Sequence, residues 1–317
     1  MLKSTQGFAL VIVIWILTLL SLMAGSFAQN MRRESSVSLA LKNNAAALAL
    51  TETGLGLAEY MMQQGEPEQR WLSDGTIYQV LRSDGSIRIK LISETGKIDI
   101  NAADETLLSA VVNAAVPDSR QQQLIFDSIL DWRDGDDDPK PHGAEKKQYQ
   151  DAGLAYAPNN RPFQTLEELQ MVLGMNADIY ALIQPWITIY SGQSEVDLEQ
   201  AMPEVLQIIS NNLNEKNIQN PALQQKLSGA TQQNPNGQNP AQVGDNANRT
   251  YTIMVEVLME DGASATVESV IRFQSQDPSL APLYVMDWKL NQSAQSLFSD
   301  DMESRIVTVQ NELTINN

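Results

Sequence analysis

The sequence predicts an α+β protein in which a long N-terminal helix packs on an antiparallel sheet, with an all-α domain inserted into that sheet. Three observations predict this fold. Residues 8–64 suit one continuous helix, strand patterns occur both before and after a block with helical periodicity, and hairpin turns separate neighbouring strand patterns. Strands on both sides of a helical block favour a single sheet, because the entropic cost of closing a loop rises only logarithmically with its length.

The N-terminal helix begins with an apolar run. Residues 8–28 read FALVIVIWILTLLSLMAGSFA and contain no charged residue. A helix of this length is about 31 Å long, which matches the hydrocarbon core of a bilayer. No proline occurs from Gln29 to Gln64, and alanine and leucine recur there at a spacing that suits one side of a helix. We therefore predict one helix of more than 50 residues, with a membrane part at 8–30 and an external part at 31–65.

Strand patterns occur in two separate regions. The first region, 66–95, contains strand patterns at 77–81 and 87–92 around the turn Ser83-Asp84-Gly85-Ser86. The second region, 250–292, contains strand patterns at 251–259, 265–273 and 283–290, and a hairpin turn at 260–263 joins the first two. The tail, 293–317, has mixed polarity and predicts no particular element.

The block between these regions, 96–213, is predicted to be an inserted helical domain. Helical patterns cover 101–116, 119–133, 165–173 and 176–184. A weak internal repeat places an extended stretch and a helix at 98–108 and again at 196–206. Residues 214–249 are rich in Asn, Gln, Pro and Gly and poor in apolar residues, which predicts a linker.

The composition excludes several classes of protein. The chain has no cysteine, which excludes disulfide scaffolds, zinc–thiolate sites and thiol nucleophiles. Its only histidine is His142, which excludes an enzyme whose metal is held by several imidazoles. A formal net charge of −18 disfavours nucleic-acid binding, because nucleic acids present negatively charged phosphates. No motif of a nucleophilic hydrolase or a P-loop is present, so we expect a protein that is not an enzyme.

An acidic segment in the helical block is the richest candidate site. Four carboxylates occupy positions 1, 3, 5 and 12 of a calcium-loop spacing: Asp134, Asp136, Asp138 and Glu145. Position 6 of such a loop is a glycine, whereas this chain has Pro139, so the segment is not an EF-hand. We predict that a differently shaped loop binds calcium here, with Asp131 as a further candidate ligand. The alternative is an acidic loop that is simply exposed to solvent.

The N-terminus resembles that of pilins and pseudopilins. A short leader, 1–7, ends in Gly7, and the apolar helix begins at once with Phe8. The resemblance implies that a prepilin peptidase cleaves between these two residues. Most members of the family carry glutamate at the fifth position of the cleaved chain, where it pairs with the terminal amine of a neighbouring subunit. This chain has Ile12 there, which points to the minor pseudopilin K family of type II secretion.

Four further segments resemble landmarks of pseudopilin K and extend the resemblance to about residue 213. They are GKIDIN at 96–101, DWRD at 131–134, PFQTLEEL at 162–169 and AMPEVL at 201–206. The resemblance implies a pilin-like fold with calcium in the inserted domain. It also implies a tip subunit that helps to initiate the pseudopilus. The implied partners are minor pseudopilins I and J, together with H, and the implied protein binds no nucleic acid.

The same resemblance implies one pass through the inner membrane, in contact with its lipid, and the bulk of the chain in the periplasm. Counting basic residues alone gives the opposite orientation, because Lys3 lies before the span whereas Arg32, Arg33 and Lys42 follow it. Two other functions stay open. One is a minor pilin of a type IV pilus or DNA-uptake system, and the other is an exported calcium-binding hydrolase that signal peptidase releases after Ala28.

Overall fold

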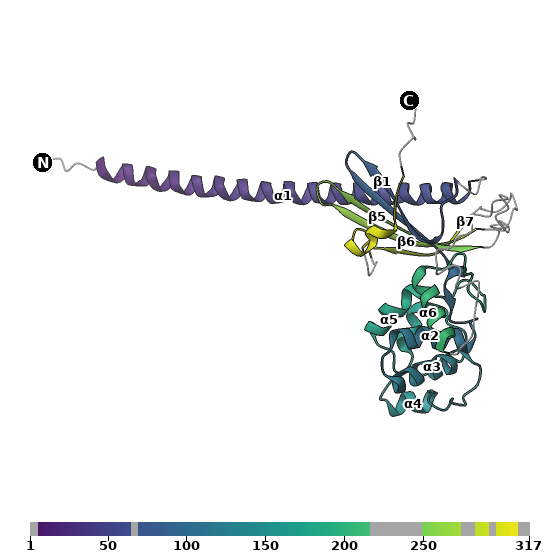
Figure 1. Ribbon diagram of the computed structural model, residues 1–317. Coiled ribbons are helices and arrows are strands. Elements are labelled where there is room, and N and C mark those ends of the chain that lie inside the picture. Colours follow the sequence, from purple (N-terminus) through teal and green to yellow (C-terminus); the bar gives the residue numbers. More distant parts are fainter. Residues whose placement is uncertain (1–5, 65–68, 216–248, 274–282, 292–295, 310–317) are drawn as a thin grey trace.

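Figure 1 shows the computed structural model of the chain, which describes residues 6–64, 69–215, 249–273, 283–291 and 296–309. The predicted α+β fold is confirmed. Helix α1 runs from Gln6 to Met62, and its N-terminal part extends far beyond the remainder of the molecule. Its 57 residues span about 85 Å. The linker predicted at 214–249 lies almost entirely outside the described residues.

A six-stranded sheet forms the centre of the molecule. Its strands lie in the order β7-β6-β5-β2-β1-β8, and all neighbours are antiparallel except β8 and β1, which are parallel. The strands are β1 (Asp74–Arg82), β2 (Gly85–Ser93), β5 (Thr250–Met259), β6 (Ser264–Phe273), β7 (Leu283–Leu290) and β8 (Ile306–Val309). The inserted domain separates β2 from β5 in the sequence, yet these strands pair over nine residues, from Gly85–Met259 to Ser93–Tyr251.

The C-terminal half of α1 packs on one face of this sheet. Alternate residues of the central strands point toward it, because side chains of a strand alternate between the two faces. Ile89 and Val255, which lie opposite each other on β2 and β5, are fully buried in this layer. Gly54 permits the close approach of the helix, since a Cβ atom there would lie 2.5 Å from Val255 Cγ1.

The tail covers part of the other face of the sheet. Residues 296–305, which include the 3-10 helix η5 (Asp300–Arg305), bury Leu297 and Met302 against Ile77. Two buried charged residues of the sheet hold this segment. The Arg88 guanidinium donates to the Leu297 carbonyl at 2.8 Å, and the Glu256 carboxylate accepts the Leu297 N–H at 2.5 Å.

The inserted domain is helical and has its own core. Its α-helices are α2 (Glu105–Ala115), α3 (Ser119–Arg133), α4 (Lys146–Asp151), α5 (Ala177–Ile183) and α6 (Pro203–Glu215). Its shorter elements are the 3-10 helices η2 (Glu94–Gly96), η3 (Leu166–Met171) and η4 (Gln184–Trp186) and the two parallel strands β3 (Ile98–Asp99) and β4 (Ile187–Thr188). Trp132, Tyr149 and Phe163 are its largest buried side chains, and the Trp132 and Phe163 rings stack with centroids 5.9 Å apart.

Buried polar contacts join the inserted domain to the sheet. The Glu94 carboxylate accepts a hydrogen bond from Lys97 Nζ at 2.7 Å and another from the Thr252 hydroxyl at 2.6 Å. The Thr188 hydroxyl also donates to Glu94. The inserted domain thus lies on the side of the sheet opposite α1 (Figure 1).

Several elements differ in extent from the sequence prediction. The helix predicted at 101–116 begins only at Glu105, because the Asp104 carboxylate caps it by accepting the Leu107 N–H at 2.8 Å. The segment predicted at 165–173 is a 3-10 helix rather than an α-helix. The second half of the internal repeat contains helix α6 but no strand at 196–198, since Ile98 pairs with Ile187 instead.

Candidate functional site

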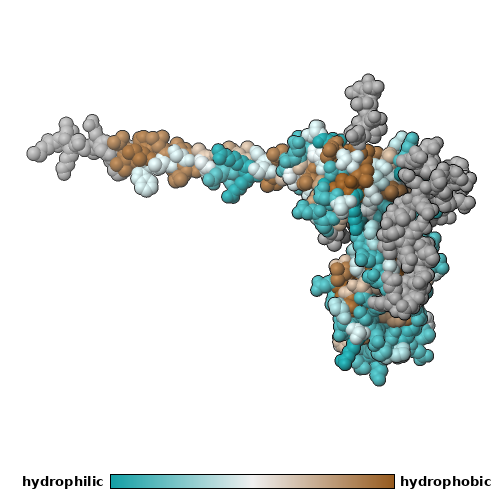
Figure 2. All heavy atoms as spheres, viewed as in Figure 1, coloured by the Kyte–Doolittle hydropathy of each residue, from teal (hydrophilic) through white to brown (hydrophobic). Residues whose placement is uncertain are grey.

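The N-terminal half of α1 is apolar on all sides and contacts no other described element. The large apolar side chains from Leu10 to Met31 are 44–72% exposed. The mean hydropathy of the best 18-residue window of the helix is 2.4, and length and composition allow it to span a membrane. Figure 2 shows the apolar atoms gathered along this part of α1, with a hydrophilic band farther along the helix. A helix with apolar residues on every side requires an apolar environment, which a bilayer or neighbouring helices supply.

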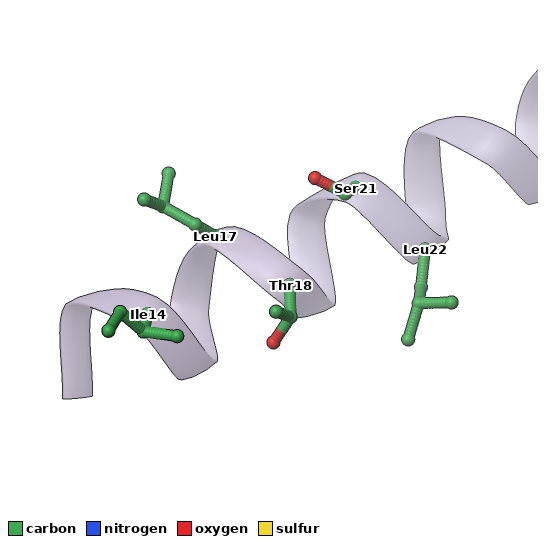
Figure 3. Close-up of a pocket in the computed structure, with 5 residues that line it drawn as sticks. All are labelled: Ile14, Leu17, Thr18, Ser21 and Leu22. Atoms are coloured by element: carbon green, nitrogen blue, oxygen red, sulfur yellow. The ribbon is translucent and has the colours of Figure 1, made fainter. Parts of the chain in front are cut away.

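The residues predicted for processing lie at the start of this helix. Gly7 and Phe8 belong to its first turns, whereas the leader before Gln6 lies outside the described residues. Ile12 is 44% exposed. A shallow recess farther along is lined by Ile14, Leu17, Thr18, Ser21 and Leu22 (Figure 3). All five lining residues are exposed, so the recess is part of the outer surface of the helix. The Thr18 hydroxyl is satisfied within the helix, since it donates to the Trp15 carbonyl at 2.8 Å.

The acidic loop follows helix α3 and closes on its last turn. Asp131 is fully buried in that turn, and its two carboxylate oxygens each lie 3.2 Å from the Lys140 N–H. Gly143 lies against the same carboxylate, since a Cβ there would come within 2.0 Å of Asp131 Oδ2. The chain therefore turns back over Asp131 before α4 begins.

One lysine partly neutralises this loop. Lys140 Nζ lies 2.9 Å from Asp134 Oδ2 and 3.6 Å from Asp131 Oδ1. The neighbouring carboxylate raises the pKa of Lys140, chiefly through its hydrogen bond with Asp134. Lys140 was not among the residues that the sequence singled out, although it is the only lysine among residues 131–145.

Two buried carboxylate oxygens of the loop have no hydrogen-bond partner: Asp134 Oδ1 and Glu145 Oε1. Glu145 itself is only 4% exposed. Burial raises its pKa to about 7, and the negative charges of Asp131 and Asp134 add to this effect. Burial also raises the pKa of Asp131. This concentration of negative charge with unpaired oxygens is the chemistry that a hard cation relieves.

The predicted ligands fall into two groups. Asp131, Asp134 and Glu145 are electrostatically coupled at the buried side of the loop. Asp136 and Asp138 are exposed, and the Asp136 carboxylate accepts the Asp138 N–H at 2.9 Å. Within the described residues, no three carboxylates or imidazoles converge on one point at metal-binding distance. Calcium at this loop therefore stays a prediction.

His142 lies in the loop but outside the carboxylate cluster. The backbone N–H of His142 donates to Asp127 Oδ2 at 2.9 Å, and the imidazole Nδ1 lies 3.4 Å from the same oxygen. The side chain is 57% exposed. Asn160 is a second residue that the sequence analysis did not single out. Its side-chain amide donates to the Asp137 carboxylate at 3.0 Å and so holds the segment around Asn160 against the loop.

Comparison with known proteins relates the chain to one secretion component. Residues 90–192 match the family model described as type II secretion system (T2SS), protein K. This segment begins in β2, includes the acidic loop and ends after β4 of the inserted domain. It therefore contains the DWRD and PFQTLEEL segments that carry the sequence resemblance.

Curated relatives carry the same description. Type II secretion system protein K of Klebsiella pneumoniae is 24% identical over 226 residues, which cover 63% of this chain and 67% of that protein. The Dickeya chrysanthemi protein of the same name is 32% identical over 72 residues, which cover 23% of this chain and 19% of that protein. The putative protein K of Escherichia coli strain K12 is 24% identical over 204 residues, which cover 58% of this chain and 62% of that protein.

Among solved structures, the chain is similar to one from the crystal structure of the GspK–GspI–GspJ complex of the enterotoxigenic Escherichia coli type 2 secretion system. The identity is 18%, the TM-score is 0.49, and the match covers 83% of this chain and all of the other. The family model and the curated relatives confirm the resemblance that the sequence carries. The chain is thus similar to type II secretion system protein K, most clearly over residues 90–192.

Proposed function

We propose that this protein is a minor pseudopilin at the tip of the pseudopilus, where it helps to initiate assembly for protein export across the outer membrane. Its partners are minor pseudopilins I and J of the same system, together with minor pseudopilin H. The single observation that carries the proposal is Ile12, which stands in an uncharged apolar helix at the position where filament subunits of the resembled family carry glutamate.

The physical reason lies in the cost of a charge in an apolar bundle. A carboxylate within a membrane helix is stabilised by a cationic partner such as the terminal amine of the next subunit. A tip subunit has no subunit above it, so no terminal amine is available to pair with a carboxylate at this position. The inserted domain supports the same position, because it projects from the face of the sheet opposite α1, where it would hinder stacking in a filament interior (Figure 1).

The proposal includes processing and topology. Prepilin peptidase cleaves between Gly7 and Phe8, and α1 then anchors the chain by one pass through the inner membrane. The sheet and the inserted domain lie in the periplasm. The apolar N-terminal half of α1 supports the anchor, and the similarity to the protein K family supports the orientation.

Assembly with the partner pseudopilins tests this function. We expect the full chain, extracted from membranes in mild detergent, to co-purify with pseudopilins I and J. Changing Ile12→Glu should reduce the number of pseudopili at least tenfold, because the carboxylate lacks an amine partner. Ile12→Leu is the matched control and should assemble normally. Normal assembly and secretion by Ile12→Glu would show that the missing charge does not define the tip position.

We also propose that the acidic loop binds calcium. The residues present fit a hard cation, because Asp134 and Glu145 offer buried oxygens without partners and Asp131 is buried beside them. Asp136 and Asp138 can add ligands from the exposed side of the loop. A bound calcium would take over the neutralising role of Lys140. The loop would then hold the α3 and α4 end of the inserted domain rigid for contacts with partner subunits.

Thermal unfolding of the full chain tests the calcium site directly. We expect calcium at millimolar concentration to raise the unfolding temperature at pH 8, and magnesium to raise it much less. Asp134→Asn and Glu145→Gln should each abolish the calcium response. Asp178→Asn, a change of an exposed acid on α5 outside the loop, should leave it intact. An equal response in all variants would mean that calcium binds elsewhere.

A further inference from the structure

Strand β7 carries an apolar row that is largely exposed in the described structure. The row consists of Leu283, Val285, Trp288 and Leu290, which lie opposite Phe273, Ile271, Ser269 and Val267 of β6. Directly opposite residues of an antiparallel pair point to the same face of a sheet. The β6 partners pair in turn with Tyr251, Ile253 and Val255, which belong to the buried layer beneath α1. The row therefore lies on the α1 face of the sheet.

A β-bulge creates this row. Strict alternation from Leu283 would place Asp287 and Lys289 on the same face, but the register shifts between the Asp287–Val270 and Val285–Ile271 pairs. Met286 is the extra residue, and it brings Trp288 and Leu290 to the α1 face instead. The polar residues Asp287 and Lys289 point to the other face, where Lys289 Nζ reaches Glu167 of the inserted domain at 2.9 Å.

Three of the four residues in the row are exposed in spite of their composition, whereas Leu283 is partly buried against the layer beneath α1. Val285 is 52% exposed, Trp288 47% and Leu290 41%. One edge of the sheet thus presents three large apolar side chains together on a single face. Such a group on a folded protein marks an interaction surface, and tryptophan is among the residues that contribute most to binding energy.

The spacing of the sheet indicates what fits over the row. The main contacts of helix α1 with the sheet are made to β2, β5 and β6. Strand β7 lies two strands from β5, which corresponds to about 9.6 Å at the usual strand separation. Packed helices have their axes about 8–10 Å apart. A second helix laid over β7 would therefore touch both the apolar row and the side of α1.

We propose that the β7 row is the docking surface for the N-terminal helix of a second single-pass, pilin-like subunit, running alongside α1. A membrane-anchored partner suits the site because α1 continues into the apolar segment, so that the bilayer would hold both helices side by side. The surface is also continuous with the buried α1–sheet layer, whose side chains it extends by one strand. This inference rests on the proposed function and specifies where one partner binds.

Cysteine crosslinking tests the surface, because the natural chain contains no cysteine. Leu290→Cys places a single thiol in the row, and Tyr284→Cys places one on the opposite face of the same strand, where the side chain is 55% exposed. Each full chain is labelled with a photoactivated crosslinker in membranes that contain the other pseudopilins. We expect Leu290→Cys to form an adduct with the N-terminal helix of another pseudopilin, at least tenfold more than Tyr284→Cys does.

Three results would overturn the proposal: equal adducts from both positions, an adduct with a second copy of this chain, or an adduct with a soluble protein. A second variant keeps the test independent of the label. Trp288→Glu should reduce co-extraction of the same partner at least tenfold, whereas Tyr284→Glu should not. If the unmodified chain co-extracts no pseudopilin, the proposed function fails. The docking surface alone is wrong if the unmodified chain co-extracts a pseudopilin, Trp288→Glu does not reduce this co-extraction, and Leu290→Cys forms no more adduct than Tyr284→Cys.

Discussion

The sheet region and the inserted domain differ in how they treat buried charge. In the sheet region, Arg88 bonds to a backbone carbonyl and forms an ion pair with Glu303 at 2.8 Å. At the junction with the inserted domain, the Glu94 carboxylate is paired with Lys97. In the inserted domain, the acidic loop has one lysine for several carboxylates, and buried oxygens of Asp134 and Glu145 stay without partners.

This difference separates a scaffold from a binding site. Buried polar groups that are fully paired stabilise one arrangement, whereas unpaired ones destabilise a fold unless a ligand compensates for them. The sheet region needs no added ion to be complete. The acidic loop is incomplete on its own, which is the physical argument for a cation there.

The largest expected effect tests the pairing at the junction. Glu94→Ala removes the carboxylate and leaves the Lys97 ammonium, which is only 8% exposed, without its partner. We expect the free energy of unfolding of the full chain to fall by about 3–5 kcal/mol, measured by denaturant titration. The double variant Glu94→Leu with Lys97→Met should recover most of that loss. If Glu94→Ala unfolds like the natural chain, the junction charges do not hold the two regions together.

The next effect concerns Glu145 and depends on pH. Its pKa is about 7 in the folded chain, compared with 4.5 as the ordinary value. Below pH 4.5 the carboxyl is neutral in both the folded and the unfolded chain, so it carries no penalty. As the pH rises toward 7 the unfolded chain ionises first, and the folded chain loses up to about 3 kcal/mol by pH 8.

Glu145→Gln should remove this penalty. In the presence of a chelator, we expect the variant to be about 3 kcal/mol more stable than the natural chain at pH 8 and equally stable at pH 4. Saturating calcium should narrow the difference at pH 8 because the cation stabilises the natural carboxylate. A difference that is constant across this pH range would show that Glu145 acts through packing rather than through charge.

A third effect tests the close packing of α1 on the sheet. Gly54→Val places atoms against Val255 and Ile87, and overpacking of this kind costs about 1–3 kcal/mol. Gly56→Val is the matched control on the same helix, because a Cβ there meets no atom within 4 Å. Thermal unfolding of both variants in detergent should show a loss only for Gly54→Val. Equal melting temperatures would mean that α1 does not pack on the sheet as described.

The smallest effect is expected at an exposed contact between the two regions. Lys289 pairs with Glu167, whose side chain is 51% exposed. An exposed ion pair of this kind contributes less than about 1 kcal/mol. Lys289→Met should therefore change the unfolding midpoint only slightly at low salt and not at all in 1 M salt. A large decrease in the unfolding midpoint would mean that the Lys289–Glu167 pair, rather than Glu94 and Lys97, holds the two regions together.

Elements with a strong local signal could be predicted from the sequence. Helix α3 spans the predicted 119–133, because its apolar residues recur at helical spacing and Asp118 caps it. The continuous helix α1 was predicted from its apolar run and the absence of proline from Gln29 to Gln64, and the two hairpins from turn residues between strand patterns. Helix α4 was missed because only Tyr149 among its six residues is apolar. Strand β8 was missed because its four residues depend on parallel pairing with β1, which no local pattern indicates.

The sites show the same division. The spacing of acids predicted a cation loop, yet the role of Lys140 as an internal cation depends on how the chain folds back over Asp131. The β7 row depends on the bulge at Met286, and a two-residue alternation would have assigned Asp287 to the apolar face. The role of Lys140 and the β7 row both depend on contacts between distant parts of the chain. Local sequence patterns therefore could not predict them.

The most direct test of the pseudopilin assignment is the intact mass of the membrane-extracted chain, with prepilin peptidase present and absent. We predict that the chain begins at Phe8 only when the peptidase is present, and that it stays in the membrane fraction. A chain that begins at Gln29 in both conditions would contradict the account, because it would mean release by signal peptidase and the loss of the helix on which the proposed assembly depends.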